Sequence, residues 1–363
     1  MDEREIERIY SGCTRFLSGH GPMTPRQVFE QLAAETDPSV QSDRYGGGEL
    51  LAGFESEVAA LLGKPAAVFM PSGTMCQPIA LRIWADRRQS RNVAFHPTCH
   101  LHLHEADAYQ LLHGLHGIRV GSSKCLMTLA DLEGVAERLA ALLLELPQRE
   151  IGGQLPSWEE LVAMTGWARE REIPLHLDGA RVWECVPFYR RTLAEIAALF
   201  DTVYVSFYKT LGGIAGAVLA GPEDVIADAR VWQHRHGGRV VRLFPLVLSA
   251  QHALRTRRDR VGAYHARAIE LSAALTALPG IAIRPNPPHT NMMHLFLRGD
   301  GERLAAAARD VAETRGTWLF ASPRPTDLLD YQMVELMVGD ATLELDTAEV
   351  VALVNEVLQR AAA

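Results

Sequence analysis

The stretch that decides the fold is TVYVSFYKTLGG, residues 202–213. Its first six residues are mostly β-branched or aromatic, which predicts a strand, and the two glycines at its end predict a turn. Lys209 lies between strand and turn, and the chain has only two other lysines, Lys64 and Lys124. An amine at an apolar strand end beside glycines suits a Schiff base better than a surface position.

Strands and helices alternate along the first two thirds of the sequence. Short apolar runs predict strands at 66–70, 141–146, 174–177, 202–207 and 215–220. Helical spacing and capping signals predict helices near 25–33, 50–63, 79–84, 157–172 and 193–200. This order predicts an α/β protein with a mostly parallel, doubly wound sheet.

The pattern changes after about Pro245. A long helical region leads to strands near 281–284, 292–297 and 333–338, with helices over 301–314 and from about 346. We therefore predict three parts. They are an N-terminal arm and helix (1–40), a large domain (41–250) and a smaller C-terminal α+β domain (251–363).

The composition favours a small-molecule substrate. The chain has 36 basic and 44 acidic residues, a net charge of −8 that offers no positive surface to nucleic acid or an anionic membrane. No apolar run reaches the roughly 18 residues of a membrane span, and the first residues resemble no secretion signal, so we expect a cytoplasmic protein. The five scattered cysteines form no CxxC pair and predict reduced thiols.

Three polar signals fall at predicted strand ends, where open α/β sheets bind ligands. Residues 72–74 (Ser-Gly-Thr) open a helix whose free N–H groups suit a phosphate, although such a turn is also an ordinary strand-to-helix connection. Asp178 ends another strand, and a buried carboxylate there can keep a pyridine nitrogen protonated. The alternative for Asp178 is a structural ion pair with Arg181. Lys209 is the third signal.

A dense group of histidines offers a competing interpretation. If residues 96–104 formed a strand, alternate histidines would share one face and could ligate zinc. Their spacing matches no standard structural site, so we expect no metal and a functional role for one histidine. The group comprises His96, Cys99, His100, His102 and His104.

In combination, these motifs resemble the threonine aldolase / β-eliminating lyase family. The motifs, in order, are DRYG (43–46), MPSGTM (70–75), His100, HLDGAR (176–181) and SFYKTLG (206–212). The resemblance implies a pyridoxal 5'-phosphate (PLP) enzyme of fold type I, which is the aspartate-aminotransferase-like fold with a seven-stranded large-domain sheet. It also implies a homodimer or homotetramer with sites at the subunit interface.

The resemblance assigns roles to individual residues. Lys209 would hold PLP as a Schiff base, Asp178 would bind the ring nitrogen, and His100 would stack on the ring and serve as the nearest base. Arg181 would contact the ring and the substrate carboxylate, with Ser18 also near that carboxylate. The remaining implied cofactor residues are Ser72, Gly73, Thr74, Ser206 and Arg242, the last given across the subunit boundary, and Glu105 matches a further family position.

Two departures from the family pattern bear on the substrate. Gln148 stands where the family has a histidine on the substrate-hydroxyl side. Glu335 stands where a carboxylate-clamping arginine is usual, and a glutamate there would repel an amino-acid carboxylate. Either the register slips by one residue or the substrate differs from plain threonine.

The expected reaction is retro-aldol cleavage of a β-hydroxy-α-amino acid to glycine and an aldehyde. One alternative is another PLP reaction on the same fold, such as β-elimination or chemistry on an atypical amine. A second is a non-catalytic PLP-fold binding protein. A nicotinamide enzyme is disfavoured because no Gly-x-Gly-x-x-Gly follows an early strand.

Overall fold

The computed structural model describes residues 3–363, and these form two compact units. One unit comprises the described residues up to Thr24 together with Arg260–Ala363, and the other is Pro25–Asp259. We describe each unit by itself. The predicted division at residues 40 and 250 stays a prediction.

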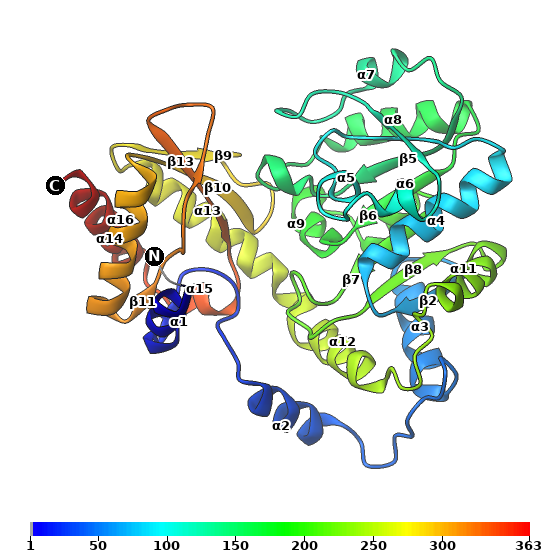
Figure 1. Cartoon of the computed structure of the whole chain (residues 1–363), viewed down its shortest axis with the longest axis horizontal. Coiled ribbons are helices and arrows are strands. Elements are labelled where there is room, and N and C mark those ends of the chain that lie inside the picture. The colour runs from blue at the N-terminus through cyan, green and yellow to red at the C-terminus, as the bar shows by residue number, and fades with distance from the viewer. Residues whose placement is uncertain (1–2) are drawn as a thin grey trace. The chain divides into compact units, whose positions relative to one another are not determined.

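The larger unit contains a seven-stranded sheet in the order β2-β8-β7-β6-β5-β3-β4 (Figure 1). Strand β8 is antiparallel to both of its neighbours, and the strands from β7 to β4 are parallel. The mostly parallel, seven-stranded sheet was therefore predicted correctly. The strands are β2 (Ala66–Met70), β3 (Asn92–Phe95), β4 (His116–Arg119), β5 (Leu139–Glu145), β6 (Leu175–Gly179), β7 (Thr202–Ser206) and β8 (Ala217–Gly221).

Helices cover both faces of this sheet because alternate side chains of a strand point to opposite faces. In β2, Val68 and Met70 join the apolar cluster of α4 and α11, whereas Phe69 packs on Phe54 of α3. The helices of this unit are α2 (Pro25–Glu35), α3 (Glu49–Leu61), α4 (Gly73–Arg88), α5 (His100–Leu103), α6 (Ala108–Leu111), α7 (Leu129–Glu133), α8 (Trp158–Glu170), α9 (Cys185–Tyr189), α10 (Leu193–Ala197), α11 (Glu223–Arg235) and α12 (Phe244–Arg257).

Local signals placed the starts of α2, α3, α8 and α10 within one residue, whereas α5, α6, α7, α9 and α11 were not predicted. The Ser157 hydroxyl accepts from the Glu160 N–H while the Glu160 carboxylate accepts from the Ser157 N–H, which is the predicted capping box. The strand considered for the histidine group is wrong. His100–Leu103 is a short helix, in which the Leu103 and His104 N–H groups donate to the carbonyls of Cys99 and His100.

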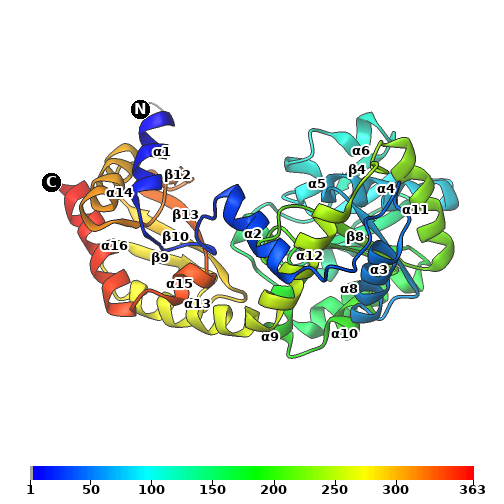
Figure 2. The same cartoon turned by 90° about the horizontal axis from the view of Figure 1, so that it is seen from below.

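The smaller unit is an α+β structure with a four-stranded antiparallel sheet in the order β12-β13-β10-β9. The unit also contains a two-stranded parallel sheet, which β1 and β11 form. Helices α14 and α16 pack together (Figure 2). The elements are α1 (Glu3–Gly12), β1 (Arg15–Phe16), α13 (Val261–Thr276), β9 (Ile281–Arg284), β10 (Met292–Arg298), α14 (Gly301–Arg315), β11 (Thr317–Trp318), β12 (Arg324–Pro325), β13 (Tyr331–Met337), α15 (Asp340–Leu343) and α16 (Thr347–Ala362).

None of the helices in residues 3–363 has the length and apolar character needed to span a bilayer.

Side chains satisfy the backbone groups of the edge strand β2. The buried Glu55 carboxylate accepts from the Phe69 N–H at 2.8 Å and from Arg230 at 2.5 and 3.2 Å. Arg230 also donates to the Ala67 carbonyl, and the Gln233 amide donates to the Phe69 carbonyl at 2.7 Å. These contacts stabilise the edge and hold the end of β2, from which α4 starts.

We expect Glu55→Ala to lower the free energy of unfolding by about 2 kcal/mol, because the Phe69 N–H would lose its acceptor in a buried position. Urea denaturation measures this. Glu57→Ala on the same helix is the matched control, since Glu57 forms a 3.7 Å ion pair with the exposed Arg255, and it should cost less than about 1 kcal/mol. Equal losses for the two variants would contradict the role given to Glu55.

Candidate functional site

The start of α4 is shaped for close approach to its N–H groups. Ser72 is the N-cap residue, and its Oγ accepts from the Thr74 N–H at 3.2 Å. Gly73 packs directly on the side chain of Tyr204, whose hydroxyl would lie 1.9 Å from a Cβ added at position 73. Only glycine fits there, and the first turn of α4 carries no acidic residue. This turn therefore favours an anion.

Asp178 lies at the carboxyl end of β6, between Glu145 of β5 and Tyr204 of β7 in the strand register. It is 1% exposed. Its Oδ1 accepts from the Ala180 N–H at 3.1 Å, whereas its Oδ2 is buried and has no hydrogen-bond partner among residues 3–363. A buried carboxylate oxygen without a partner is costly, which indicates that a donor from a ligand completes it.

Lys209 follows β7 and is partly buried. Burial lowers its pKa, Asp178 opposes this shift, and the nearby Arg181 guanidinium lowers the pKa further. The Lys209 amine lies 6.0 Å from the centre of the Tyr208 ring. A larger share of this amine is therefore neutral, and so nucleophilic, near neutral pH than of an ordinary lysine.

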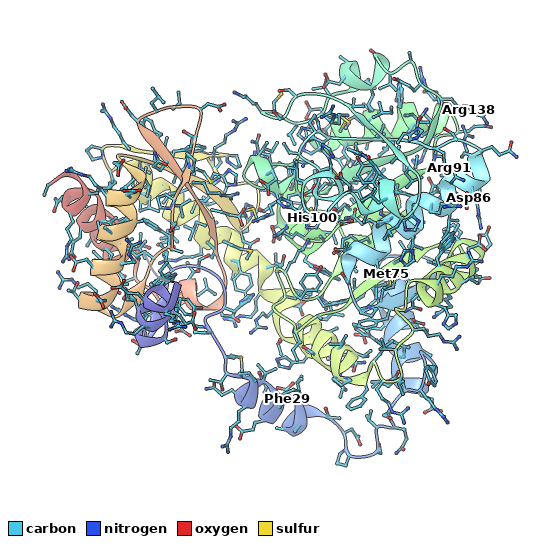
Figure 3. The ribbon with its side chains drawn as sticks, in the orientation of Figure 1. Phe29, Met75, Asp86, Arg91, His100 and Arg138 are labelled. Atoms are coloured by element: carbon cyan, nitrogen blue, oxygen red, sulfur yellow. The ribbon has the colours of Figure 1, made fainter. Side chains whose placement is uncertain are left out.

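His100 is the first residue of α5, and Met75 lies in the first turn of α4. Figure 3 labels both side chains. Its Nδ1 lies 3.1 Å from Glu105 Oε1, and the Gln77 amide donates to the same oxygen at 3.0 Å. Burial raises the pKa of Glu105, while the contact with His100 lowers it. This buried carboxylate fixes the orientation of the His100 ring.

A second buried carboxylate, Glu145, ends β5. It accepts from the backbone N–H of His100 at 3.0 Å and from the Gln148 amide at 3.3 Å. Burial, together with the charge of the neighbouring Asp178, raises its pKa to about 7. The Gln148 amide also donates to Thr98 Oγ1 at 3.1 Å. Glu145 thus joins the predicted residues His100 and Gln148.

Our sequence analysis did not predict roles for Glu145 and Gln77. A carboxylate at the carboxyl end of a predicted strand is the same signal that identified Asp178, and it would have found Glu145. Gln77 lies inside α4 and no local pattern distinguishes it.

The other predicted residues have mixed surroundings. Arg181 Nε is buried without a hydrogen-bond partner in the described part of the chain. The Ser206 hydroxyl donates to the Ala180 carbonyl at 2.7 Å, and Arg242 donates to the Asp43 carbonyl at 2.5 Å. Their cofactor roles stay predictions.

Ser18 and Glu335 belong to the smaller unit. The Ser18 hydroxyl donates to the Met337 carbonyl at 3.1 Å and accepts from the Met337 N–H at 3.2 Å. Glu335 lies 3.8 Å from Arg324 and 3.9 Å from His294. Their predicted contacts with the substrate stay predictions.

Histidines of this group contact neighbouring side chains and a backbone carbonyl. His96 contacts Thr98 Oγ1 through Nδ1 and the Cys125 carbonyl through Nε2. His104 lies 2.9 Å from Glu150. Within residues 3–363, no three His, Cys, Asp or Glu side chains are grouped so that they could hold a metal ion.

The sequence profile of the β-eliminating lyase family matches residues 29–299. The chain belongs to the β-eliminating lyase family. This confirms the family that the motifs indicated.

Two solved structures resemble the chain over almost its whole length. A protein of Exiguobacterium sp. 255-15, provisionally named aromatic amino acid β-eliminating lyase/threonine aldolase, is 42% identical, with a TM-score of 0.93 and coverage of 98% of this chain and 99% of that one. A protein of Listeria monocytogenes EGD-E, provisionally named L-allo-threonine aldolase, is 38% identical, with a TM-score of 0.94 and the same coverage. The low specificity L-threonine aldolase of Escherichia coli K12 is 29% identical over 304 residues, covering 80% of this chain and 87% of that one. The predicted fold type I is confirmed.

We expect Gly73→Ala to lower the free energy of unfolding by about 1 to 3 kcal/mol, because the fully buried Tyr204 ring cannot withdraw from the added methyl group. Urea denaturation measures the change. Gly53→Ala in α3 is the control: no atom lies within 4 Å of its added Cβ, and alanine should stabilise that helix by up to about 1 kcal/mol. If Gly73→Ala left the free energy of unfolding unchanged, the packing of position 73 on Tyr204 would not be as tight as described.

Glu145 predicts a pH-dependent contribution to stability. Its folded pKa of about 7 lies above the ordinary value of 4.5 for a glutamate, so the folded state holds the proton more tightly, and stability is lost as the pH rises from about 4.5 through 7. The Glu145→Gln variant should therefore gain stability relative to the wild type between pH 5 and pH 8 in thermal unfolding. The exposed Glu159→Gln serves as control. If the difference in thermal stability between Glu145→Gln and the wild type did not change with pH, the raised pKa of Glu145 would be contradicted.

Proposed function

We propose that the chain is a PLP-dependent lyase that cleaves β-hydroxy-α-amino acids to glycine and an aldehyde. The observation that carries the proposal is the buried Asp178 Oδ2, which has no hydrogen-bond partner in the described part of the chain, near the Lys209 amine, whose pKa is lowered. The names of the relatives support the same reaction class.

The residues of the site fit the cofactor. Among residues 3–363, Asp178 Oδ2 lacks a donor, which a protonated pyridine nitrogen would supply. The first turn of α4, which has no acidic side chain and is open to close approach at Gly73, favours a phosphate, and Lys209 lies near Asp178. When bound, PLP supplies an electron-accepting ring for the electrons of the breaking Cα–Cβ bond.

The side chains of the chain would divide the proton transfers. Asp178 would keep the ring nitrogen protonated, and the neutral Lys209 amine would hold the cofactor and exchange with the substrate amine. An ionised Glu105 can only accept from His100 Nδ1, 3.1 Å away, so a neutral His100 ring beside it carries its lone pair on Nε2. Nε2 can then take the proton of the β-hydroxyl group as the Cα–Cβ bond breaks.

Several finer features belong to the same proposal. Arg181, Ser18, Gln148 and Glu335 would contact the substrate. The Gln148 amide cannot act as a base, so the hydroxyl proton would depend on His100. We further propose a cytoplasmic homodimer or homotetramer with Arg242 completing a neighbouring site.

Addition of PLP to the purified protein should give a yellow species that borohydride fixes to Lys209, as peptide mapping would show. The Lys209→Ala variant should lose the label, and Lys124→Ala is the matched control that should keep it. Asp178→Asn should lower the rate of glycine formation from β-hydroxy amino acids by about a hundredfold or more.

The same assays separate the alternatives. Pyruvate and ammonia from β-substituted amino acids, without aldehyde release, would indicate β-elimination. PLP bound to Lys209 with no turnover of any amino acid would indicate a binding protein. Failure of the wild type to take up PLP would overturn the proposal.

A further inference from the structure

Two tyrosine hydroxyls meet at the first turn of α4, and the function proposed above gives them no role. Tyr204 of β7 lies under Gly73 and is 1% exposed. Tyr208 directly precedes Lys209. The two hydroxyl oxygens are 3.4 Å apart, and the Gly73 N–H donates to the Tyr208 hydroxyl. The Tyr208 hydroxyl therefore already lies at the anion-binding end of the helix.

The hydrogen bonds leave the Tyr208 proton available to a ligand. A phenol has one O–H donor and can accept two hydrogen bonds. The Tyr208 oxygen accepts from the Gly73 N–H, and the buried Tyr204 O–H has that same oxygen as its neighbour at 3.4 Å. Either phenol can donate across this 3.4 Å separation, and when the Tyr204 O–H donates to the Tyr208 oxygen, the Tyr208 proton is available to a ligand.

An independent observation shows that a ligand belongs next to these hydroxyls. Among residues 3–363, Asp178 Oδ2 is buried without a hydrogen-bond partner, and Asp178 and Tyr204 are register partners on neighbouring strands. The Tyr208 ring also lies 6.0 Å from the Lys209 amine. The carboxylate, the amine and the two phenols are thus neighbours at one edge of the sheet.

We propose that Tyr208 is a phosphate ligand of this site, donating its hydroxyl proton to a phosphate oxygen of the cofactor, and that Tyr204 positions it. The inference rests on the proposed function, because it takes PLP as the ligand. The hydroxyl of Ser206, for which a cofactor contact is predicted, donates its proton to the Ala180 carbonyl. Tyr208 supplies a further hydroxyl at the helix end.

The contact has a clear chemical logic. Two N–H groups of a helix turn cannot satisfy all the acceptor oxygens of a phosphate, and a phenol donor adds a hydrogen bond to a charged group, which is stronger than a neutral one. Tyr204 fixes the phenol from below, where Gly73 leaves space for its hydroxyl. The residue before the Schiff-base lysine would then hold the opposite end of the same cofactor.

The test compares Tyr208→Phe with the wild type for two ligands, PLP and pyridoxal, which lacks the phosphate. Dissociation constants come from absorbance titrations of the cofactor-free protein. We expect the PLP dissociation constant of Tyr208→Phe to rise about ten- to a hundredfold, since a hydrogen bond to a charged group is lost, while that for pyridoxal stays unchanged. The ³¹P resonance of bound PLP should also shift.

Tyr189→Phe is the matched control, because it removes a buried hydroxyl that has no hydrogen-bond partner among the described residues. It should bind both ligands as the wild type does. Equal PLP affinity in Tyr208→Phe, or an equal loss for PLP and pyridoxal, would overturn the phosphate role while leaving the proposed function intact. If the wild type itself binds no PLP, the proposed function fails and the inference fails with it.

Discussion

The site depends on the electrostatic balance between Asp178 and Lys209. Asp178 is 1% exposed and Lys209 is partly buried. Burial lowers the pKa of Lys209, and the carboxylates of Asp178, Glu145 and Glu105 oppose that shift. The net effect is an amine that loses its proton more readily than an ordinary lysine. A Schiff-base chemistry requires such an amine.

The same balance explains the raised pKa values around it. Three carboxylates share one region, and desolvation together with mutual repulsion raises the pKa of Glu105 and of Glu145. Each is held by hydrogen bonds from fixed donors, Glu105 from Gln77 and Glu145 from the His100 N–H. These donors offset the cost of burying the two carboxylates. Glu105 in turn contacts Nδ1 of His100 and fixes the orientation of that ring.

Topology brings these groups together. Parallel strands end at the same edge of the sheet, so Glu145 and Asp178, at the ends of β5 and β6, are register partners, and Tyr204 is the partner of Asp178 on β7. The helix α4 starts at this edge, and Gly73 allows its first turn to approach Tyr204. The backbone geometry thereby brings the Asp178 and Glu145 carboxylates, the start of α4 and the Tyr204 hydroxyl to the same edge of the sheet.

The sequence by itself determined the order of elements, the mostly parallel sheet, and the candidates Lys209, Asp178 and 72–74, because periodicity, turn residues and strand-end polar groups are local signals. It missed β3 and β4, which are only four residues long, and it considered a strand for 96–104 where a short helix forms. Only the tertiary structure decided that Glu145 and Gln77 hold His100, that Ser206 faces a backbone carbonyl, and that Tyr204 and Tyr208 meet Gly73. Those contacts join residues far apart in the chain, and their distances follow from packing between elements that no local pattern encodes.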